Sequence, residues 1–480
     1  MGRQHAVNDS DFLRVAPRGA FVLLSLLVAF LLALNSIGPV RSSVPPSINP
    51  EPASLVLGQT SFNTNASKSG PSGLSEPEFL AFDGSGDLWV SDYNNSLVAE
   101  YTPPFMTGES ASLELGSLSF STTGCSGTGA GDVCNPNGIA FDPSGNLWVA
   151  DSGNNSIVEF KAPFTTGERS AIAIGEYSDG QPNATNLDEP QGIAFDSAGN
   201  LWVADSSDNR VVEYKAPLAS GEAASLVIGQ ASLTSATDDD GRANLSSPED
   251  VAFDHSGNLW VADTQDSRVL EFAFPFSNGE EASAVIGAPN FSSVSGNDTQ
   301  STLTLPEAIA FDHSGDLWVS DSGNSRVLEF PQPLATGENA TDLIGQYSYF
   351  YGGPNATQYQ LGYPEGIAFD STGNLWVADP GYARVLEYSD PLTYKPTSTT
   401  STSTSITSTT TLLATTSLST SSQSPVSTSS SSSSSLPTST ASSTGTVPAF
   451  PYELIGVAAL VVVVSVSYMI TRRRVLTGRA

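Results

Sequence analysis

Short apolar runs, each ended by turn-forming residues, recur along most of the chain. The segment 138–160, GIAFDPSGNLWVADSGNNSIVEF, shows the pattern most fully: GIAFD, LWVAD and SIVEF are apolar runs, and residues typical of turns separate them. Runs of this length between turn residues predict β-strands. Helical spacing is absent because Gly or Pro interrupts every stretch. The pattern therefore predicts an all-β body.

One motif, Asp/Asn-Leu-Trp-Val-Ser/Ala-Asp, occurs six times and contains all six tryptophans of the chain: Trp89, Trp148, Trp202, Trp260, Trp318 and Trp376. Successive tryptophans are 59, 54, 58, 58 and 58 residues apart. A nearly constant period of this length indicates a repeat architecture in which each copy is one supersecondary unit. In each repeat, the motif supplies the second of three successive strands, and a fourth apolar run, such as 224–230, follows a further turn.

The fourth strand occurs once before the first full repeat and is missing after the last. Its extra copy is ASLVLGQ at 53–59, whereas the sixth repeat runs directly from its third strand into a Ser/Thr-rich segment. Pairing of 53–59 with 384–388 would complete the last sheet, close a ring and leave no exposed sheet edge. We therefore expect a six-bladed β-propeller of four-stranded antiparallel blades, whose N-terminal strand closes the last blade.

The repeated residues have structural explanations in this fold. We expect the tryptophans to pack between neighbouring sheets rather than to form a ligand-binding ring. The aspartates that close the first and second strands, such as Asp142 and Asp151, are expected to accept hydrogen bonds from turn amides. Four arginines open the third strand and should pair with these carboxylates: Arg210, Arg268, Arg326 and Arg384.

The repeated core resembles NHL repeats over roughly residues 53–390, through Gly-Ile-Ala-Phe-Asp, Gly-Asn-Leu-Trp-Val-Ala-Asp and Asn-x-Arg-Val-x-Glu. The resemblance implies the fold but no single function, because propellers host unrelated activities. NHL-type propellers include protein- or RNA-binding modules, sensor domains of membrane receptors and the lyase of peptide amidation. The resemblance to that lyase would require a histidine-rich zinc centre, but this chain has only three histidines: His5, His255 and His313. The last two occupy equivalent turn positions in adjacent repeats, so a catalytic histidine pair is not expected.

Apolar and Ser/Thr-rich segments flank the predicted propeller. Residues 20–34 form an apolar run after two arginines, which favours a signal peptide and leaves an uncleaved signal anchor open. Residues 454–470 are uncharged and precede Arg472–Arg474, as expected of a membrane helix with a cytoplasmic basic end. The predicted order is a signal peptide or anchor with a short linker (1–42), the propeller (43–395), a disordered stalk (396–448), a transmembrane helix (449–471) and a basic cytoplasmic tail (472–480). The propeller is then extracytoplasmic.

The charge is strongly acidic and restricts the possible partners. The chain has 18 basic and 50 acidic residues, a formal net charge of −32. Such a body repels phosphate backbones, so nucleic-acid binding is not expected, and cations should be attracted instead. An acidic or saline habitat would also explain the composition.

Two further features agree with an extracytoplasmic location. Cys125 and Cys134, the two cysteines of the chain, lie in a Gly-rich loop that could close a disulfide; two free thiols are the alternative. Candidate N-glycosylation sites begin at Asn65, Asn94, Asn154, Asn183, Asn244, Asn290, Asn297, Asn339 and Asn355. The Ser/Thr-rich stalk is a candidate for O-glycosylation.

A polar residue follows the proline that precedes each first strand, and these six residues are the candidate site: Glu78, Asn137, Gln191, Glu249, Glu307 and Glu365. The innermost strands of a propeller begin near its axis. The six side chains could therefore form a channel-mouth ring suited to an oxygen-coordinated cation, with Ca²⁺ as the candidate cofactor. Their strand parity matches that of the neighbouring Ile and Phe, which points them between blades unless the chain twists at entry. In that case they are a polar lining or partners of arginine.

The long connections between repeats, such as 176–189 and 347–363, are where a protein or glycan ligand could bind. The aromatic stretch 347–363 could contact such a ligand or pack over the blades, and Asp238–Asp240 could hold a cation or remain a solvated loop. The favoured hypothesis is a cell-surface binding, adhesion or envelope-interaction module without catalytic residues. The alternative is an extracytoplasmic metal-dependent lyase, lactonase or hydrolase that uses a central cation. A structural spacer in a cell-envelope lattice is a third hypothesis.

Overall fold

The computed structural model describes residues 51–117, 120, 125, 132–175, 181–237, 241–292, 296–349, 355–389 and 391. The predicted signal segment, stalk, transmembrane helix and tail lie outside these residues, as do Asp238–Asp240 and part of the aromatic stretch. None of the helices within the described ranges is long and apolar enough to cross a membrane.

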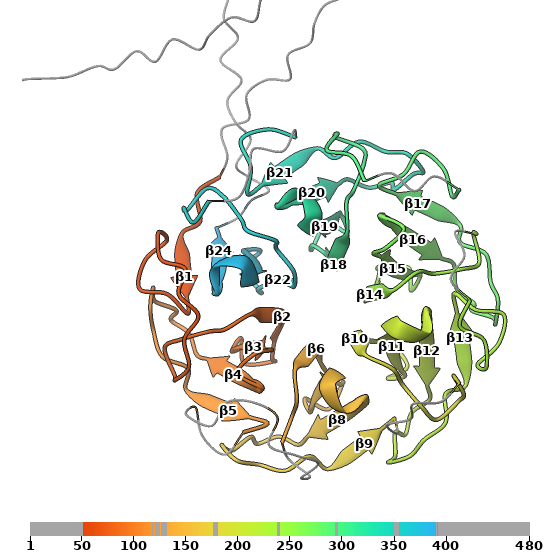
Figure 1. The fold of residues 1–480 in the computed structure, drawn as a ribbon, viewed down its shortest axis with the longest axis horizontal. Helices are drawn as coiled ribbons and strands as arrows, with labels where there is room; N and C mark the ends of the chain where they lie inside the picture. Colours follow the sequence, from red (N-terminus) through yellow and green to blue (C-terminus); the bar gives the residue numbers. More distant parts are fainter. Residues whose placement is uncertain are drawn as a thin grey trace, which may run out of the picture. The chain divides into compact units, whose positions relative to one another are not determined.

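Six four-stranded antiparallel sheets are arranged around a central axis, as predicted (Figure 1). The innermost strands are β2 (Pro77–Phe82), β6 (Pro136–Phe141), β10 (Pro190–Phe195), β14 (Pro248–Phe253), β18 (Pro306–Phe311) and β22 (Ile367–Phe369). The second strands are β3 (Leu88–Asp92), β7 (Leu147–Asp151), β11 (Leu201–Asp205), β15 (Leu259–Asp263), β19 (Leu317–Asp321) and β23 (Leu375–Asp379). We number the blades 1 to 6 in the order of these strands.

The outer half of each blade is built from two further strands. The third strands are β4 (Leu97–Tyr101), β8 (Ser156–Phe160), β12 (Arg210–Tyr214), β16 (Arg268–Phe272), β20 (Arg326–Phe330) and β24 (Arg384–Tyr388). The outermost strands are β5 (Leu113–Leu115), β9 (Ile172–Ile174), β13 (Leu226–Ile228), β17 (Ala284–Ile286), β21 (Asp342–Ile344) and β1 (Leu55–Leu57). Four of the turns between second and third strands contain a short 3₁₀ helix: η1 (Ser152–Asn154), η2 (Ser206–Asp208), η3 (Ser322–Asn324) and η4 (Pro380–Tyr382).

The N-terminal strand closes the ring. β1 pairs antiparallel with β24, with Leu55 opposite Glu387 and Leu57 opposite Val385. The main-chain N–H of Ser54 extends this ladder by donating to the carbonyl of Glu387 at 2.7 Å. The predicted closure is therefore confirmed, and it supplies blade 6 with a fourth strand that its own repeat lacks.

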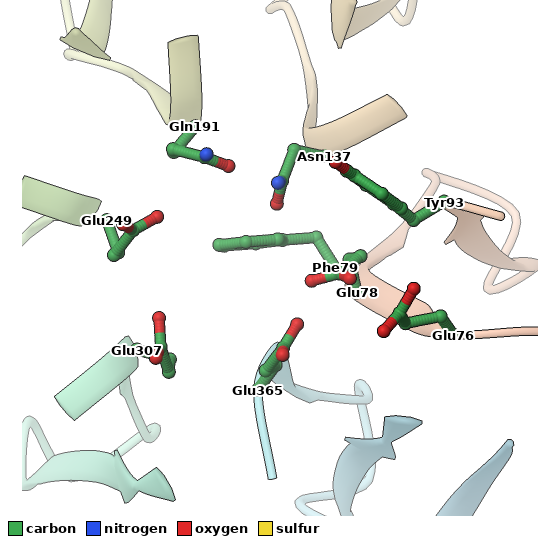
Figure 2. A pocket seen from close by; sticks show the side chains of 9 residues that line it. All are labelled: Glu76, Glu78, Phe79, Tyr93, Asn137, Gln191, Glu249, Glu307 and Glu365. Atoms are coloured by element: carbon green, nitrogen blue, oxygen red, sulfur yellow. The ribbon is translucent and has the colours of Figure 1, made fainter. Parts of the chain in front are cut away.

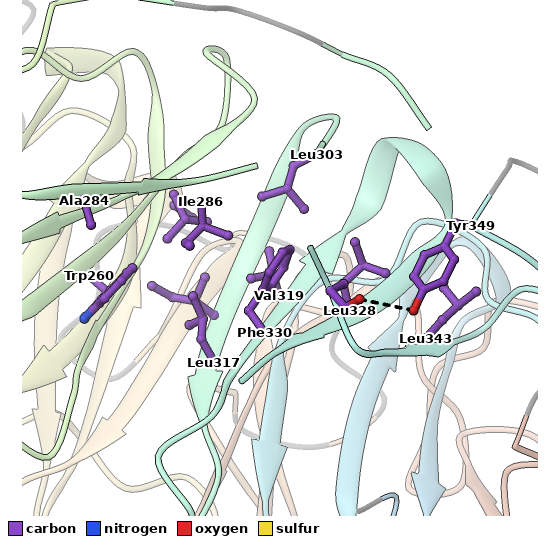
Figure 3. Packing of buried hydrophobic residues seen from close by; sticks show 14 residues of the cluster. Trp260, Ala284, Ile286, Leu303, Leu317, Val319, Leu328, Phe330, Leu343 and Tyr349 are labelled. Carbon is purple, nitrogen blue, oxygen red and sulfur yellow. Dashed lines mark hydrogen bonds between the residues drawn. The ribbon is translucent and has the colours of Figure 1, made fainter. Parts of the chain in front are cut away.

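Aromatic contacts recur in the core between neighbouring blades, among a larger number of aliphatic residues. Each repeat tryptophan meets the phenylalanine that ends the first strand of the next blade, including Trp376 of blade 6 and Phe82 of blade 1, with ring centroids 5.7–6.1 Å apart. Edge-to-face geometry of this kind is favourable for buried aromatic pairs. Figure 3 shows the apolar packing around such a contact, where Trp260 and Ile286 of blade 4 face Leu317 of blade 5. The tryptophans are scaffold residues, as predicted.

The predicted arginine pairs are also present, and they are buried. In blade 3, Arg210 Nε donates to Asp205 Oδ2 at 2.6 Å, and the guanidinium also donates to the carbonyls of Leu233 and Asn186. Asp205 Oδ1 accepts from the main-chain N–H of Asp188, in the connection that leads into β10 of the same blade. These bonds fasten the long loop to the blade. Blades 4, 5 and 6 repeat the pair with Arg268 and Asp263, Arg326 and Asp321, and Arg384 and Asp379.

Candidate functional site

An irregularity at the start of the innermost strands decides where the predicted ring residues point. In blade 1, Pro77 lies opposite Asp92 and Leu80 opposite Val90, so β2 has one more residue than β3 over this stretch. The same shift occurs at the start of β6, β10, β14 and β18. An extra residue reverses the alternation of side chains along a strand. In these five blades, the residue after the proline therefore faces the axis rather than the neighbouring blade.

All six predicted ring residues line one cavity of about 290 Å³: Glu78, Asn137, Gln191, Glu249, Glu307 and Glu365. Figure 2 shows their side chains converging from six blades, with the two amides on one side and three of the carboxylates on the other. The four acidic members belong to the contiguous blades 4, 5, 6 and 1. The cavity therefore has a strongly acidic half.

The acidic half contains few groups that could neutralise it. The Ser206 hydroxyl donates to Glu249 Oε1 at 3.2 Å. The side chains of Glu307 and Glu365 accept no hydrogen bond from the described residues. Within the same ranges, no lysine or arginine forms an ion pair with a ring carboxylate. A cation from outside the propeller would therefore meet unpaired carboxylates.

Burial and mutual repulsion raise the pKa values of these carboxyls. Burial raises the pKa of Glu307 to about 7, and burial together with the nearby Glu76 and Asp379 raises that of Glu365 to about 8. The pKa of Glu249 lies well above its ordinary value because of burial and the charge of Glu307. Like charges that share a poorly solvated site resist ionisation together. The cavity would therefore release protons when a cation enters.

Three residues that were not predicted also line the cavity: Glu76, Phe79 and Tyr93. Phe79 and Tyr93 occupy positions where the other repeats have a different kind of residue, whereas Glu76 corresponds to Glu189 in blade 3. Phe79 stands where Gly138 and Gly192 occur, and Tyr93 stands where Ser152 occurs. Comparing the repeats position by position would have found them. No rule of local structure distinguishes such a residue from ordinary variation in the repeat.

The two amides form the other half of the cavity. Asn137 is only 6% exposed, and no hydrogen bond from its side chain to a described residue is found. The buried Oε1 of Gln191 also lacks a partner among the described residues. Buried polar atoms normally have hydrogen-bond partners, so these two side chains point to a ligand or to ordered water. The residues present therefore fit an oxygen-coordinated cation.

The opposite end of the blades carries two carboxylate clusters that were not predicted: Asp83, Asp87 and Glu100 in blade 1, and Asp312, Asp316 and Glu329 in blade 5. In blades 2, 3, 4 and 6 an asparagine replaces the middle aspartate. In blade 2, Asn146 Nδ2 donates to Asp142 Oδ2 at 2.8 Å and to Glu159 Oε1 at 3.0 Å. The two Asp-containing blades lack this donor, so their carboxylates meet without a bridging amide.

A second cavity of about 410 Å³ lies between blades 3 and 4 at that same end. It is lined by Phe253, Phe274 and Phe276 together with His255, and Phe274 is 67% exposed. His255 and His313 lie in the exposed turns between the first and second strands of their blades. These first turns are at the opposite end of the innermost strands from the channel-mouth ring. The structure therefore places neither histidine at the predicted ring.

The remaining predicted positions are the two cysteines and the nine asparagines of the candidate glycosylation sites. Cys125 and Cys134 form a disulfide with Cα atoms 4.8 Å apart. Seven of the nine sequon asparagines are exposed, and Asn154 and Asn244 are partly buried. Glycosylation of these positions stays a prediction.

Fold, repeats and site define the class of protein: the chain is a six-bladed β-propeller containing NHL repeats. Residues 133–160 and 187–214 match the NHL repeat family, which confirms the resemblance found in the sequence. Residues 218–409 match the SMP-30/Gluconolactonase/LRE-like region family.

Similar proteins carry several different names. Teneurin-1 of Homo sapiens is 24% identical over 355 residues, which cover 65% of this chain and 12% of that protein. Peptidyl-glycine alpha-amidating monooxygenase B of Xenopus laevis is 28% identical over 213 residues, covering 40% of this chain and 22% of that protein. A solved gluconolactonase of Xanthomonas campestris is 15% identical with a TM-score of 0.43, covering 72% of this chain and 98% of that one. The chain thus spans only a small part of these two curated relatives, and the similarities assign it no substrate or partner.

Proposed function

We propose that this chain is a surface binding module whose ligand face is the end of the propeller that carries the channel-mouth ring. The observation that carries the proposal is the convergence of Glu78, Glu249, Glu307 and Glu365 on one cavity without a cationic partner. Unpaired, partly buried carboxylates are unfavourable for folding, so their gathering at one end favours a role in binding. The NHL repeats and the similarity to Teneurin-1 also favour a surface binding module.

A binding role is favoured over nucleophilic catalysis by the chemistry of the cavity. The described residues that line it include no Ser, Cys, His or Lys. The long connections between blades and the 3₁₀ turns lie at the same end as the ring, and their sequences differ from repeat to repeat. Variable loops around a constant scaffold are typical of ligand-binding faces.

We further propose that segment 449–471 anchors the chain in the cell membrane and that the Ser/Thr-rich region 396–448 raises the propeller above the surface. The supporting observations are the uncharged run 454–470, the arginines that follow it and the apolar segment 20–34. The Cys125–Cys134 disulfide agrees with an extracytoplasmic location. The ligand is then a protein or glycan outside the cell.

The test compares adhesion by the wild-type chain and by the neutral-ring variant, in which Glu249, Glu307 and Glu365 are replaced by glutamine. Beads coated with the full-length chain, or with its E249Q/E307Q/E365Q variant, are mixed with cells of the source organism, and bound cells are counted. We expect at least tenfold fewer bound cells for the variant, because three of the four carboxylates of the acidic half are replaced by amides and only Glu78 remains. The variant E281Q serves as a control, since Glu281 is exposed and lies far from the ring in a weak pair with Arg242.

Two results would contradict the proposal in different ways. Equal adhesion by the wild type and the neutral-ring variant would exclude the channel mouth as the ligand face. Absence of adhesion by the wild type, with a normal melting temperature, would exclude a cell-surface adhesion function.

A metal-dependent propeller enzyme of the lyase, lactonase or hydrolase type is the second candidate function. Its support is the set of oxygen donors in the ring, which suits Ca²⁺, and the match of 218–409 to the SMP-30/Gluconolactonase/LRE-like family. A bound Ca²⁺ would polarise a carbonyl or a water molecule at the cavity. Thermal melting of the full-length chain with 0 and about 5 mM CaCl₂ tests the site, since a ligand that binds only the folded state raises the melting temperature. An equal rise in wild type and neutral-ring variant, or no rise, would contradict a ring-bound metal.

A further inference from the structure

The side chain of Phe79 distinguishes this cavity from a simple ring of oxygen donors. The equivalent residues of the other five blades are Gly138, Gly192, Asp250, Ala308 and Gly366. Most of these are small because neighbouring innermost strands approach closely: a Cβ on Gly366 would lie 2.4 Å from the carbonyl oxygen of Glu78. Figure 2 shows that the Phe79 ring extends into the middle of the cavity, between the amide side and the carboxylate side.

An aromatic ring beside carboxylates selects for one type of cation. A hydrated metal ion gains little from an aromatic face and would have to share the cavity with it. Ammonium and guanidinium groups are attracted to the face of an aromatic ring and can donate hydrogen bonds to carboxylates as well. The cavity volume of about 290 Å³ also admits an organic group.

The amide side adds hydrogen-bond acceptors to the same cavity. Gln191 Oε1 is buried without a partner among the described residues, and the Asn137 amide is similarly enclosed. A carbonyl oxygen of this kind is satisfied by an N–H donor. A quaternary ammonium has no such donor, so the geometry favours a cation that carries N–H groups.

Two apolar, exposed residues outside the cavity lining lie beside the ring positions of blades 5 and 6, and we call these two residues the rim. Leu305 and Tyr363 directly precede Pro306 and Pro364, and they are 37% and 53% exposed. Their φ angles are 49° and 62°, in the left-handed region that bulky side chains rarely adopt. The equivalent residues of the other blades are polar, and one of them, Asn135, suits this conformation better. Neither burial nor backbone conformation explains a leucine and a tyrosine at these two positions, whereas contact with a partner does.

We propose that the channel mouth is a socket for a basic side chain, the ammonium of a lysine or the guanidinium of an arginine, presented by a protein ligand. The proposal rests on the binding function proposed above and names the chemistry of the partner. The cation lies between Phe79 and the carboxylates of Glu249, Glu307 and Glu365. The side chains of Leu305 and Tyr363 contact the apolar surface of the ligand around it. A buried basic anchor inside an apolar rim is the usual anatomy of a protein-binding hot spot.

Binding of side-chain analogues to the full-length chain tests the socket. Isothermal titration calorimetry at pH 8.5 compares the amides of Nα-acetyl-arginine, Nα-acetyl-lysine and Nα-acetyl-norleucine with CaCl₂, all at constant ionic strength. We expect saturable binding of at least one basic analogue and none of the norleucine analogue. The basic analogue that binds more tightly identifies the anchor as arginine or lysine. The two basic analogues are titrated up to their solubility limit, at least 50-fold above the protein concentration. If neither shows saturable binding, the proposal is overturned.

Variants separate the contributions of charge and aromatic ring. E307Q/E365Q is expected to weaken binding of the basic analogue at least tenfold, and F79L about fivefold, while F79Y and the surface control E281Q retain it. F79L keeps an apolar side chain of similar size, so loss of folding is detected independently by its melting temperature. Tight CaCl₂ binding that survives F79L, with no binding of either basic analogue, overturns the proposal in favour of a metal site.

Failure of the socket and failure of the adhesion function give different results. If cells adhere to the wild-type chain but neither basic analogue binds it or competes with the cells, the socket is wrong and the binding function stands. If a basic analogue binds in the ring while no cells adhere, the socket stands and the adhesion function is wrong. The variant Y363N should reduce adhesion without weakening binding of the small analogue, because the rim contacts only a larger ligand.

Discussion

The carboxylates at the two ends of the propeller differ in their hydrogen bonding. At the first turn of blade 2, Asp142 accepts hydrogen bonds from the backbone and side chain of Asn146 and from Trp148 Nε1, at 2.8–3.2 Å. Although partial burial opposes it, these bonds hold the pKa of Asp142 below its ordinary value. At the channel mouth, Glu307 and Glu365 accept none from the described residues, and burial raises their pKa values.

The difference separates scaffold from site. Hydrogen-bond donors around a partly buried carboxylate stabilise its ionised form, and the carboxylate in turn stabilises the turn that supplies those donors. A buried acid without donors costs stability whenever it is ionised, so its presence needs another explanation. The first-turn aspartate occurs in all six repeats, as a structural device should, whereas only four repeats place an acid in the ring.

The largest effect is expected from removing a first-turn carboxylate. Asp142→Ala should lower the free energy of unfolding by about 3 kcal/mol, because several donors, including the buried Trp148 N–H, lose a charged acceptor. Denaturant unfolding of the full-length chain measures this. Ser144→Ala is the control, since the Ser144 side chain is exposed and only its main chain bonds to Asp142. A loss below about 1 kcal/mol would show that the turn does not depend on the carboxylate.

Removing a ring carboxylate is expected to raise the free energy of unfolding instead of lowering it. The pKa of Glu365 is about 8 in the folded chain against an ordinary value of 4.5. Between these values the unfolded chain releases a proton that the folded chain keeps, so stability falls as the pH rises. Glu365→Gln should therefore leave stability unchanged near pH 4 and raise it by about 2 kcal/mol at pH 8.5, allowing for partial solvation.

Melting curves at pH 4 to 9 measure the effect of E365Q, with Glu76 and Asp379 as the charges that face this carboxyl. Wild type and variant should diverge only above about pH 5. Parallel curves across the whole range would contradict a raised pKa at this position.

The carboxylate cluster of blade 5 and the asparagine-bridged carboxylates of blade 2 can be exchanged by single substitutions. Asp316→Asn would place an amide donor between Asp312 and Glu329, as Asn146 does in blade 2, and should stabilise the chain by about 1 kcal/mol. The reciprocal change Asn146→Asp should destabilise it by a similar amount. Thermal melting of both variants provides the measurement, and a destabilising D316N beside a neutral N146D would refute the explanation.

The smallest effect is expected at the rim. Tyr363→Asn should raise stability by about 0.5 kcal/mol, because asparagine adopts a positive φ more readily and the tyrosine ring is largely solvated. Ser247, which also has a positive φ in blade 4, provides the matched change S247N, which should also raise stability slightly because asparagine adopts this conformation more readily than serine. A clear loss of stability in Y363N would show that the tyrosine packs against the blades.

Much of the fold was predictable because the information is repeated. Six copies of one motif fixed the number of blades, and the unpaired segment 53–59 predicted the closing strand that pairs with β24. The buried arginine pairs followed from their position at the start of the third strands. Repetition averages out local ambiguity, so a weak strand pattern became a reliable one.

The candidate site was predictable only in part. The six ring residues were found from their place after a repeated proline, but strand parity alone directed them between the blades. The extra residue at the start of β2 and its equivalents reverses that parity, and a shift of register depends on pairing with β3. Phe79 and Tyr93 were missed because a departure from a repeat has no meaning until its surroundings are known.

The sequence by itself determined the class of fold, the number of blades and the way the ring closes, because strand patterns and repeat offsets are local properties of the chain. Only the tertiary structure decided which polar side chains meet at the axis and which of them lack partners. Glu78 and Glu249 are far apart in the sequence but line the same cavity. Their pKa values and ligands depend on groups brought together by the closed ring, and no single repeat contains that arrangement.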